Sequence, residues 1–178
     1  MPGSLIPALL VTGMTGAGKT TYLSKWLSSR PQGERWAVLL NDFGDARLAP
    51  DGDVFVREVA GCICCSAQVS LRTAIVALLR TAPARLLIEA SASARPSSIV
   101  SVLKEPGIAA AVALERIVCI VDPAHAIDPR YAGLALYREQ VRTADVIILA
   151  KRDLYNDAPR AAAREALASL GSAPVDDL

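Results

Sequence analysis

Short apolar runs alternate along the chain with longer segments whose apolar positions repeat at helical spacing. We predict buried strands at residues 5–11, 36–40, 86–88, 117–121 and 146–149. A shorter strand is expected at 54–56, and residues 173–178 would begin a further one. Strands that are apolar throughout are typical of a parallel sheet with both faces covered. The pattern therefore predicts an α/β fold, with a mostly parallel sheet and helices on both faces.

Helices are predicted in the segments between these strands. They are expected at residues 21–29, 66–81, from Pro96 onward, 134–142 and from Asp157 to about Leu170. In the second helix, Val69, Ala74 and Leu78 are expected on the buried side. Asp157 is expected to cap the last helix, because its carboxylate can accept a hydrogen bond from a first-turn amide.

A glycine-rich segment, Gly13-Met14-Thr15-Gly16-Ala17-Gly18-Lys19-Thr20, joins the first strand to the first helix. It fits the P-loop pattern G-x-x-x-x-G-K-[ST] in the strand-to-helix context that the motif requires. Glycines let the backbone N–H groups surround phosphates, and the positive end of the helix adds to their field. The predicted phosphate-binding residues are Gly13, Thr15, Gly16, Ala17, Gly18, Lys19, Thr20 and Thr21. The sequence therefore predicts a P-loop NTPase, in which Lys19 neutralises the β- and γ-phosphates and the Thr20 hydroxyl ligates Mg²⁺.

A second segment, Ala150-Lys151-Arg152-Asp153, follows the strand at 146–149 and is predicted to bind the base of the nucleotide. Guanine-specific NTPases carry Asn-Lys-x-Asp at this place. Asp153 would accept hydrogen bonds from guanine N1–H and N2–H₂, which adenine cannot supply, and Lys151 would lie along the base. Ala150 lacks the amide of the usual Asn, which should weaken GTP binding and selectivity by roughly 1 to 3 kcal/mol. The alternative is a surface Lys/Asp pair at a helix start.

Three of the four cysteines stand together in Gly61-Cys62-Ile63-Cys64-Cys65. Three thiolates suit Zn²⁺ or another divalent ion that accepts soft ligands, with a fourth position for water, carboxylate or imidazole. The alternative is a redox pair or a set of buried thiols. Cys119 differs, since it lies inside an apolar strand and is expected in the core.

Three further polar residues are candidates for chemistry near the predicted strand ends. Glu89 would lie close to Mg²⁺ or the attacking water, and Asp42, like Asp45, would serve as a carboxylate ligand or a switch group linked to Mg²⁺. His125 is the only histidine, and a lone histidine is more often a surface or cap residue than a ligand. Because it stands just beyond a strand end, we also treat it as a candidate metal ligand, active when its imidazole is neutral.

Composition limits the classes of function. At 178 residues, with a net charge of +1, the chain suits one domain and carries no overall field toward nucleic acid or an anionic membrane. No apolar run approaches the roughly 18 to 20 residues of a membrane span, and the N-terminal run lacks the basic flank of a signal peptide. We therefore expect a cytoplasmic protein whose thiols stay reduced.

Several motifs occur in an order that resembles the CobW-like metallochaperone GTPases, relatives of the GTPases that serve urease and hydrogenase maturation. Beside the P-loop they are Asn-Asp-Phe-Gly-Asp from 41, Gly-Cys-Ile-Cys-Cys-Ser from 61, Leu-Ile-Glu-Ala-Ser from 87, Val-Asp-Pro-Ala-His from 121 and the segment 144–153. The resemblance implies a GTP-driven metal insertase in which a divalent metal, usually zinc and in some members cobalt, binds the cysteine loop. It also implies a client metalloprotein.

This chain departs from the family pattern at several places. Asp42 replaces a glutamate, and Ala92 replaces a glycine that senses the γ-phosphate, adding a Cβ where a backbone N–H has to approach phosphate. Residues 1–178 are expected to form a single P-loop GTPase domain that lacks the family's C-terminal domain. The cysteines of two copies could also bridge one metal ion in a homodimer.

The combined prediction is a GTPase of low intrinsic turnover that couples GTP or GDP binding to metal held by Cys62, Cys64 and Cys65. Its catalytic residues would be Lys19, Thr20 and Glu89. Two alternatives stay open. One is a non-hydrolysing metal-binding or regulatory module with a degenerate G domain, and the other is an ATP-using P-loop protein with a redox cysteine loop.

Overall fold

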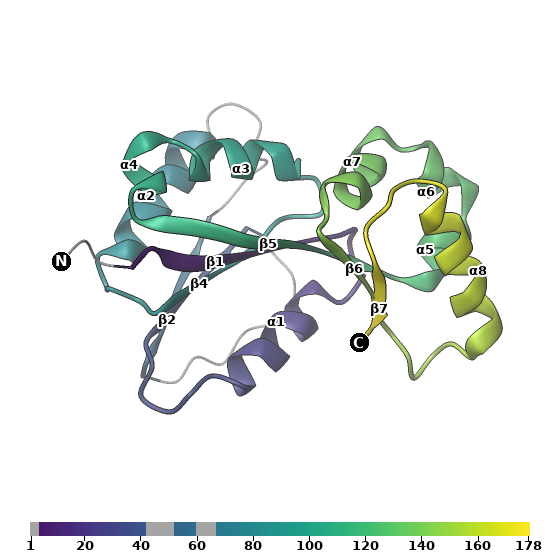
Figure 1. Cartoon of the computed structure of the whole chain (residues 1–178), viewed down its shortest axis with the longest axis horizontal. Coiled ribbons are helices and arrows are strands. Elements are labelled where there is room, and N and C mark those ends of the chain that lie inside the picture. Colours follow the sequence, from purple (N-terminus) through teal and green to yellow (C-terminus); the bar gives the residue numbers. More distant parts are fainter. Residues whose placement is uncertain (1–3, 42–51, 60–66) are drawn as a thin grey trace.

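The computed structural model describes residues 4–41, 52–59 and 67–178. These residues form a seven-stranded sheet with the order β3-β2-β4-β1-β5-β6-β7, and every neighbouring pair of strands is parallel (Figure 1). The strands are β1 (Ile6–Thr12), β2 (Trp36–Leu40), β3 (Val54–Glu58), β4 (Arg85–Glu89), β5 (Val112–Val121), β6 (Val146–Leu149) and β7 (Val175–Asp177). The predicted parallel α/β sheet is confirmed.

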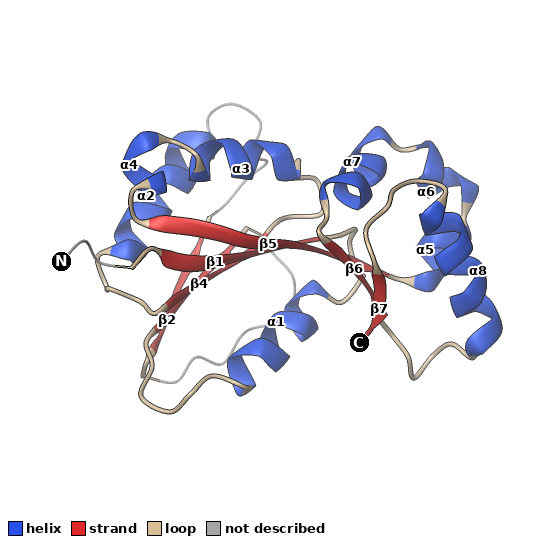
Figure 2. Ribbon diagram, in the orientation of Figure 1, coloured by secondary structure: helices blue, strands red, loops and turns tan. Residues whose placement is uncertain are grey.

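Helices cover both faces of this sheet (Figure 2). They are α1 (Lys19–Ser28), α2 (Ala67–Leu79), α3 (Pro96–Leu103), α4 (Pro106–Ala109), α5 (Pro123–Ile127), α6 (Pro129–Gly133), α7 (Ala135–Thr143) and α8 (Asp157–Ala168). Helix α1 lies on one face, α2, α3 and α4 lie on the other, and α5 to α8 gather around β6 and β7 (Figure 1). None of these helices is long and apolar enough to cross a membrane.

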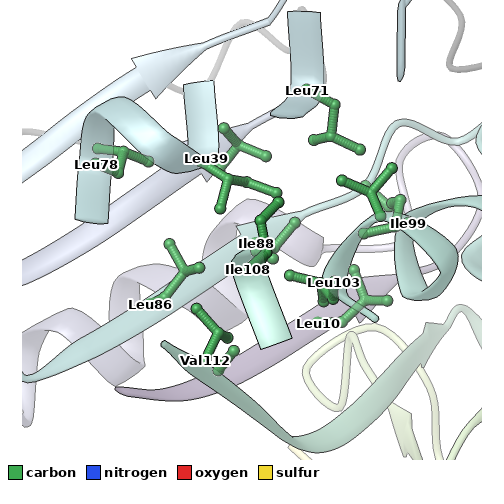
Figure 3. Close-up of a cluster of buried hydrophobic side chains, with 14 of the residues drawn as sticks. Leu10, Leu39, Leu71, Leu78, Leu86, Ile88, Ile99, Leu103, Ile108 and Val112 are labelled. Atoms are coloured by element: carbon green, nitrogen blue, oxygen red, sulfur yellow. The ribbon is translucent and has the colours of Figure 1, made fainter. Parts of the chain in front are cut away.

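The core follows from the alternation of side chains along the strands. Leu10, Leu39 and Ile88 face α2 and α3, where they meet Leu71 and Ile99 (Figure 3). Their sequence neighbours point to the opposite face and pack around α1. Because each fully buried Leu or Ile side chain contributes about 1.5 to 3 kcal/mol, these two layers fix the register of the sheet.

Three local predictions were wrong. Strand β5 begins at Val112, five residues before the apolar run, because its first residues pair with the start of β1. The exposed side chains of Glu115 and Arg116 hid that part of the strand from an apolar pattern. Val69 is 61% exposed, and Leu71, Ile75 and Leu78 form the buried side of α2 instead. Asp157 is the first residue of α8 rather than its cap, a position that Asn156 occupies.

Candidate nucleotide-binding site

Strand β1 lies between β4 and β5, so the segments that follow these three strands meet at one edge of the sheet. The chain leaves β1 toward α1 and β2 on one side, while β5 lies on the other. Ligands of open parallel sheets bind in the crevice that forms where the strand order reverses in this way. The topology therefore brings the P-loop, Glu89 and Asp122 to a single site.

The P-loop owes its shape to glycines in positive-φ conformations. Gly13, Gly16 and Gly18 have φ angles of +141°, +71° and +103°, which L side chains rarely adopt. A Cβ on Gly13 would lie 2.3 Å from the carbonyl oxygen of Ile120, so the loop passes against the backbone of β5. Thr15 and Gly16, two of the predicted phosphate-binding residues, are exposed. The loop is closed by a 3.2 Å hydrogen bond from the Ala17 N–H to the Met14 carbonyl.

The three predicted catalytic residues lie together beneath this loop. Lys19, the first residue of α1, is 4% exposed, and its Nζ is 3.4 Å from the Met14 carbonyl oxygen, to which it donates. The Thr20 Oγ1 donates a 2.8 Å hydrogen bond to Oε1 of Glu89, which is 2% exposed. A hydroxyl beside a carboxylate supplies the hard oxygen atoms that Mg²⁺ prefers, so Thr20 and Glu89 fit this ion. Thr21 follows on the exposed side of α1.

The base-recognition segment lies beside the same loop. Ala150 is 1% exposed, and its Cβ is 3.6 Å from where a Cβ on Gly18 would stand. Lys151 has a φ of +56°, and its Nζ donates a 2.7 Å hydrogen bond to Oδ2 of Asp122. Asp153 is exposed. The two side chains that the sequence predicts to recognise the base, those of Lys151 and Asp153, are thus carried by a segment beside the P-loop, and their role stays a prediction.

Asp122 is a site residue that the sequence reasoning left unassigned. It accepts from Lys151 and from the Ala124 N–H at 2.9 Å, and so caps α5. Burial alone would raise the pKa of Asp122, but hydrogen bonds from Lys151, Ala124 and Tyr155 outweigh it and lower this pKa below its ordinary value. The position of Asp122 directly after a predicted strand was the feature of the sequence that could have identified it as a site residue.

His125 is half-buried on α5, and its ring stacks on Tyr131 with centroids 4.2 Å apart. Burial lowers the pKa of His125, assisted by the charge of Lys151 and opposed by Asp122 and Asp128. The neutral imidazole, which is the metal-binding form, is therefore favoured. No described residue hydrogen-bonds its buried Nδ1. Its role as a metal ligand stays a prediction.

The cysteine cluster and the two aspartates fall outside the described residues. Cys62, Cys64, Cys65, Asp42 and Asp45 all lie in the ranges 42–51 and 60–66. Within the described ranges, no group of three His, Cys, Asp or Glu side chains is placed to hold a metal ion.

Cys119 is fully buried in β5, as predicted. Burial raises the pKa of its thiol to about 12, and the nearby charge of Lys19 only partly offsets this effect. Because the thiolate is the form that reacts and binds metal, this cysteine belongs to the core rather than to the chemistry of the site.

Comparison with known proteins agrees with this geometry. The zinc chaperone YeiR of Escherichia coli is 35% identical over 150 residues, which are 81% of this chain and 46% of that protein. The zinc chaperone CobW of a Sinorhizobium species is 28% identical over 200 residues, covering 92% and 56% of the two chains. The crystal structure of Zn(II)-bound YjiA GTPase from E. coli matches with a TM-score of 0.68 at 27% identity, over 97% of this chain and 57% of that one.

The chain thus spans about half the length of the curated relatives that it matches. The family model described as "CobW/HypB/UreG, nucleotide-binding domain" matches residues 7–174, which run from the second residue of β1 to the residue before β7 and include the P-loop. The chain therefore belongs to the CobW/HypB/UreG family and contains its nucleotide-binding domain.

Proposed function

We propose that this protein binds GTP with Mg²⁺, hydrolyses it slowly, and uses the nucleotide state to control the capture and release of zinc. The observation that carries the proposal is the buried Lys19 of the P-loop beside the hydrogen-bonded pair of Thr20 and Glu89. The names of the relatives support it, since YeiR and CobW are zinc chaperones and YjiA is a GTPase with bound Zn(II).

In the proposed reaction, Lys19 holds the β- and γ-phosphates and neutralises the charge that develops on them. Mg²⁺, bound through the Thr20 hydroxyl, would supply further positive charge at the same phosphates. Thr20 would hold Mg²⁺ through its hydroxyl, and the neighbouring carboxylate of Glu89 would accept a hydrogen bond from the attacking water. Since the sequence assigns no arginine finger, we propose a low unaided turnover.

Zinc would be held by Cys62, Cys64 and Cys65, and one feature of the described residues supports coupling to the nucleotide. The Asn41 N–H donates to the carbonyl of Glu89 at 2.9 Å, and the Asn41 Nδ2 donates to the carbonyl of Val59 at 2.9 Å. Asn41 thus links the end of β4 to Val59, directly before the segment that contains the cysteines. A shift of the chain at Glu89 would reach this segment through two hydrogen bonds.

The decisive experiment measures zinc affinity by competition with a chelating dye in three states. These are no nucleotide, GDP with Mg²⁺, and a non-hydrolysable GTP analogue with Mg²⁺. We expect the two nucleotide states to differ at least about tenfold in affinity, equivalent to about 1.4 kcal/mol of coupling. Lys19→Ala should abolish this difference and the release of phosphate from GTP, while leaving the zinc affinity of the nucleotide-free protein unchanged.

Two results would contradict the proposal. Equal zinc affinity in all three states would mean that metal and nucleotide are uncoupled, and would favour a metal-binding module that does not hydrolyse GTP. Cysteines that form a reversible disulfide and ignore zinc, together with equal use of ATP and GTP, would favour a redox P-loop protein. If coupling is found, the recipient of the zinc is proposed to be a client metalloprotein.

A further inference from the structure

Helix α7 contacts the loop that follows Glu89, and the contact runs through a buried amide side chain. Gln140 is 0% exposed, and its Nε2 donates a 3.1 Å hydrogen bond to the carbonyl of Ala92. Its Oε1 is also buried, with no hydrogen-bond partner among the described residues. A buried acceptor without a partner costs free energy that an apolar side chain would not. Core packing alone therefore does not account for a glutamine at this position.

Glu139, the residue before Gln140 on α7, contacts the residues that follow this loop. Glu139 accepts hydrogen bonds from Arg95 Nη1 at 2.6 Å and from Ser97 Oγ at 2.5 Å. The near end is fixed by the Ala90 N–H, which donates to the carbonyl of Val11 at 2.8 Å. Residues 91–94 are thus held at both ends, and Gln140 is the side chain that orients the middle.

The hydrogen bond to Ala92 also sets the direction of the next amide. In a trans peptide the carbonyl and the following N–H point in opposite directions, so directing the Ala92 carbonyl toward α7 directs the Ser93 N–H away from it. In the described part of the chain, the N–H groups of Ser91, Ala92 and Ser93 have no hydrogen-bond partner. The loop therefore offers donors two to four residues beyond Glu89, which itself contacts Thr20 of the P-loop.

We propose that Gln140 is a positioning residue that orients the Ser93 N–H toward the γ-phosphate, so that the site distinguishes GTP from GDP. The inference rests on the proposed GTP binding and deepens it by assigning the discrimination to a side chain on α7. Ala92 does not oppose this role, because Ala82 and Lys151 are the only non-glycine positive-φ residues in the described ranges. Its Cβ thus introduces no backbone strain.

The test compares affinities for a fluorescent GDP and a fluorescent non-hydrolysable GTP analogue in the wild type and in Gln140→Met. Methionine keeps the length of the side chain and removes the donor. We expect affinity for the GTP analogue to fall about tenfold and kcat for hydrolysis to fall with it, while affinity for GDP, which lacks the γ-phosphate, stays unchanged. Thr143→Val is the matched control, because it removes a 2.7 Å hydrogen bond of Thr143 Oγ1 on the same helix to the Glu139 carbonyl, which does not touch the loop.

The outcomes separate this inference from the proposed function. A wild type that binds neither nucleotide would overturn both, and a wild type that binds GDP and the GTP analogue equally would overturn the inference alone. A wild type that prefers the analogue, with an unchanged ratio in Gln140→Met, would overturn the inference alone. Equal losses for both nucleotides, or the same change in Thr143→Val, would show that the glutamine only supports the fold and would also overturn it.

Discussion

The two ends of the candidate nucleotide site, which we propose to hold the phosphates and the base, are built in different ways. At the phosphate end, Gly13 passes against the backbone of β5, and Lys19 and Thr20 are set by the first turn of α1. At the base end, Lys151 is held by an ion pair with Asp122, which lies 29 residues earlier on another strand end, and Asp153 is exposed. The first end is shaped by local backbone geometry, and the second by contacts between distant side chains.

This difference predicts how amino-acid substitutions at the phosphate end and at the base end will affect the protein. L side chains rarely adopt the positive φ angles of this loop, and at Gly13 an added methyl group would also meet the backbone of β5, so a single methyl group there is enough to disturb the loop. An exposed or partly exposed side chain can be replaced with a local loss, because solvent and neighbouring groups adjust to it. We therefore expect substitutions at the phosphate end to affect folding and binding together, and those at the base end to affect selectivity with little effect on folding.

The largest effect is expected for Gly13→Ala. Its Cβ would lie 2.3 Å from the Ile120 carbonyl oxygen at a φ of +141°, so either the loop or β5 has to move. We expect a loss of roughly 3 kcal/mol in the free energy of unfolding, measured in urea, together with loss of GTP binding.

Gly16→Ala is the matched control for that variant. Gly16 also has a positive φ, +71°, but no atom lies within 4 Å of its added Cβ. Gly16→Ala should therefore lower the free energy of unfolding by only about 1 to 2 kcal/mol, the cost of placing an alanine in the left-handed conformation. Equal losses in the two variants would show that φ alone, rather than the contact with β5, determines the shape of the phosphate end.

This comparison also explains what the sequence could predict. The P-loop and the apolar strands were predictable because their signals are local: a fixed spacing of glycines and Lys19, and runs of buried residues. The sequence placed Thr20 and Glu89 separately near Mg²⁺, whereas their hydrogen bond depends on β4 lying beside β1, which the sequence did not specify. The roles of Asp122 and Gln140 were not predictable, because each depends on a partner far away in the sequence. The start of β5 was missed for the same reason, since its pairing with β1 overrides its polar residues.

An intermediate effect is expected for Asp153→Ala, and it sharpens the contrast because it tests the base end alone. If Asp153 accepts the guanine hydrogen bonds, its removal should lower the ratio of GTP to ATP affinity by about tenfold to hundredfold, equivalent to roughly 1 to 3 kcal/mol. The free energy of unfolding should hardly change, since the side chain is exposed. Competition of each nucleotide against a fluorescent GDP measures the ratio, and an unchanged ratio would mean that the base is recognised elsewhere.

The smallest effect is expected for Asp122→Asn, which removes the charge facing Lys151 but keeps a side-chain oxygen that can still cap α5. The side chain of Lys151 is 33% exposed and that of Asp122 is 6% exposed, so solvent screens the ion pair from the lysine side only, and its loss should cost about 1 kcal/mol in urea unfolding. Asp122→Ala would also lose the bond from the Ala124 N–H, and should cost about 1 kcal/mol more, as other N-caps do. We expect both variants to bind GTP a few-fold more weakly than the wild type, because Lys151 is no longer held in place. The two variants should have about the same GTP affinity. A loss of stability in Asp122→Asn as large as that of Gly13→Ala would show that the base end is as rigidly built as the phosphate end.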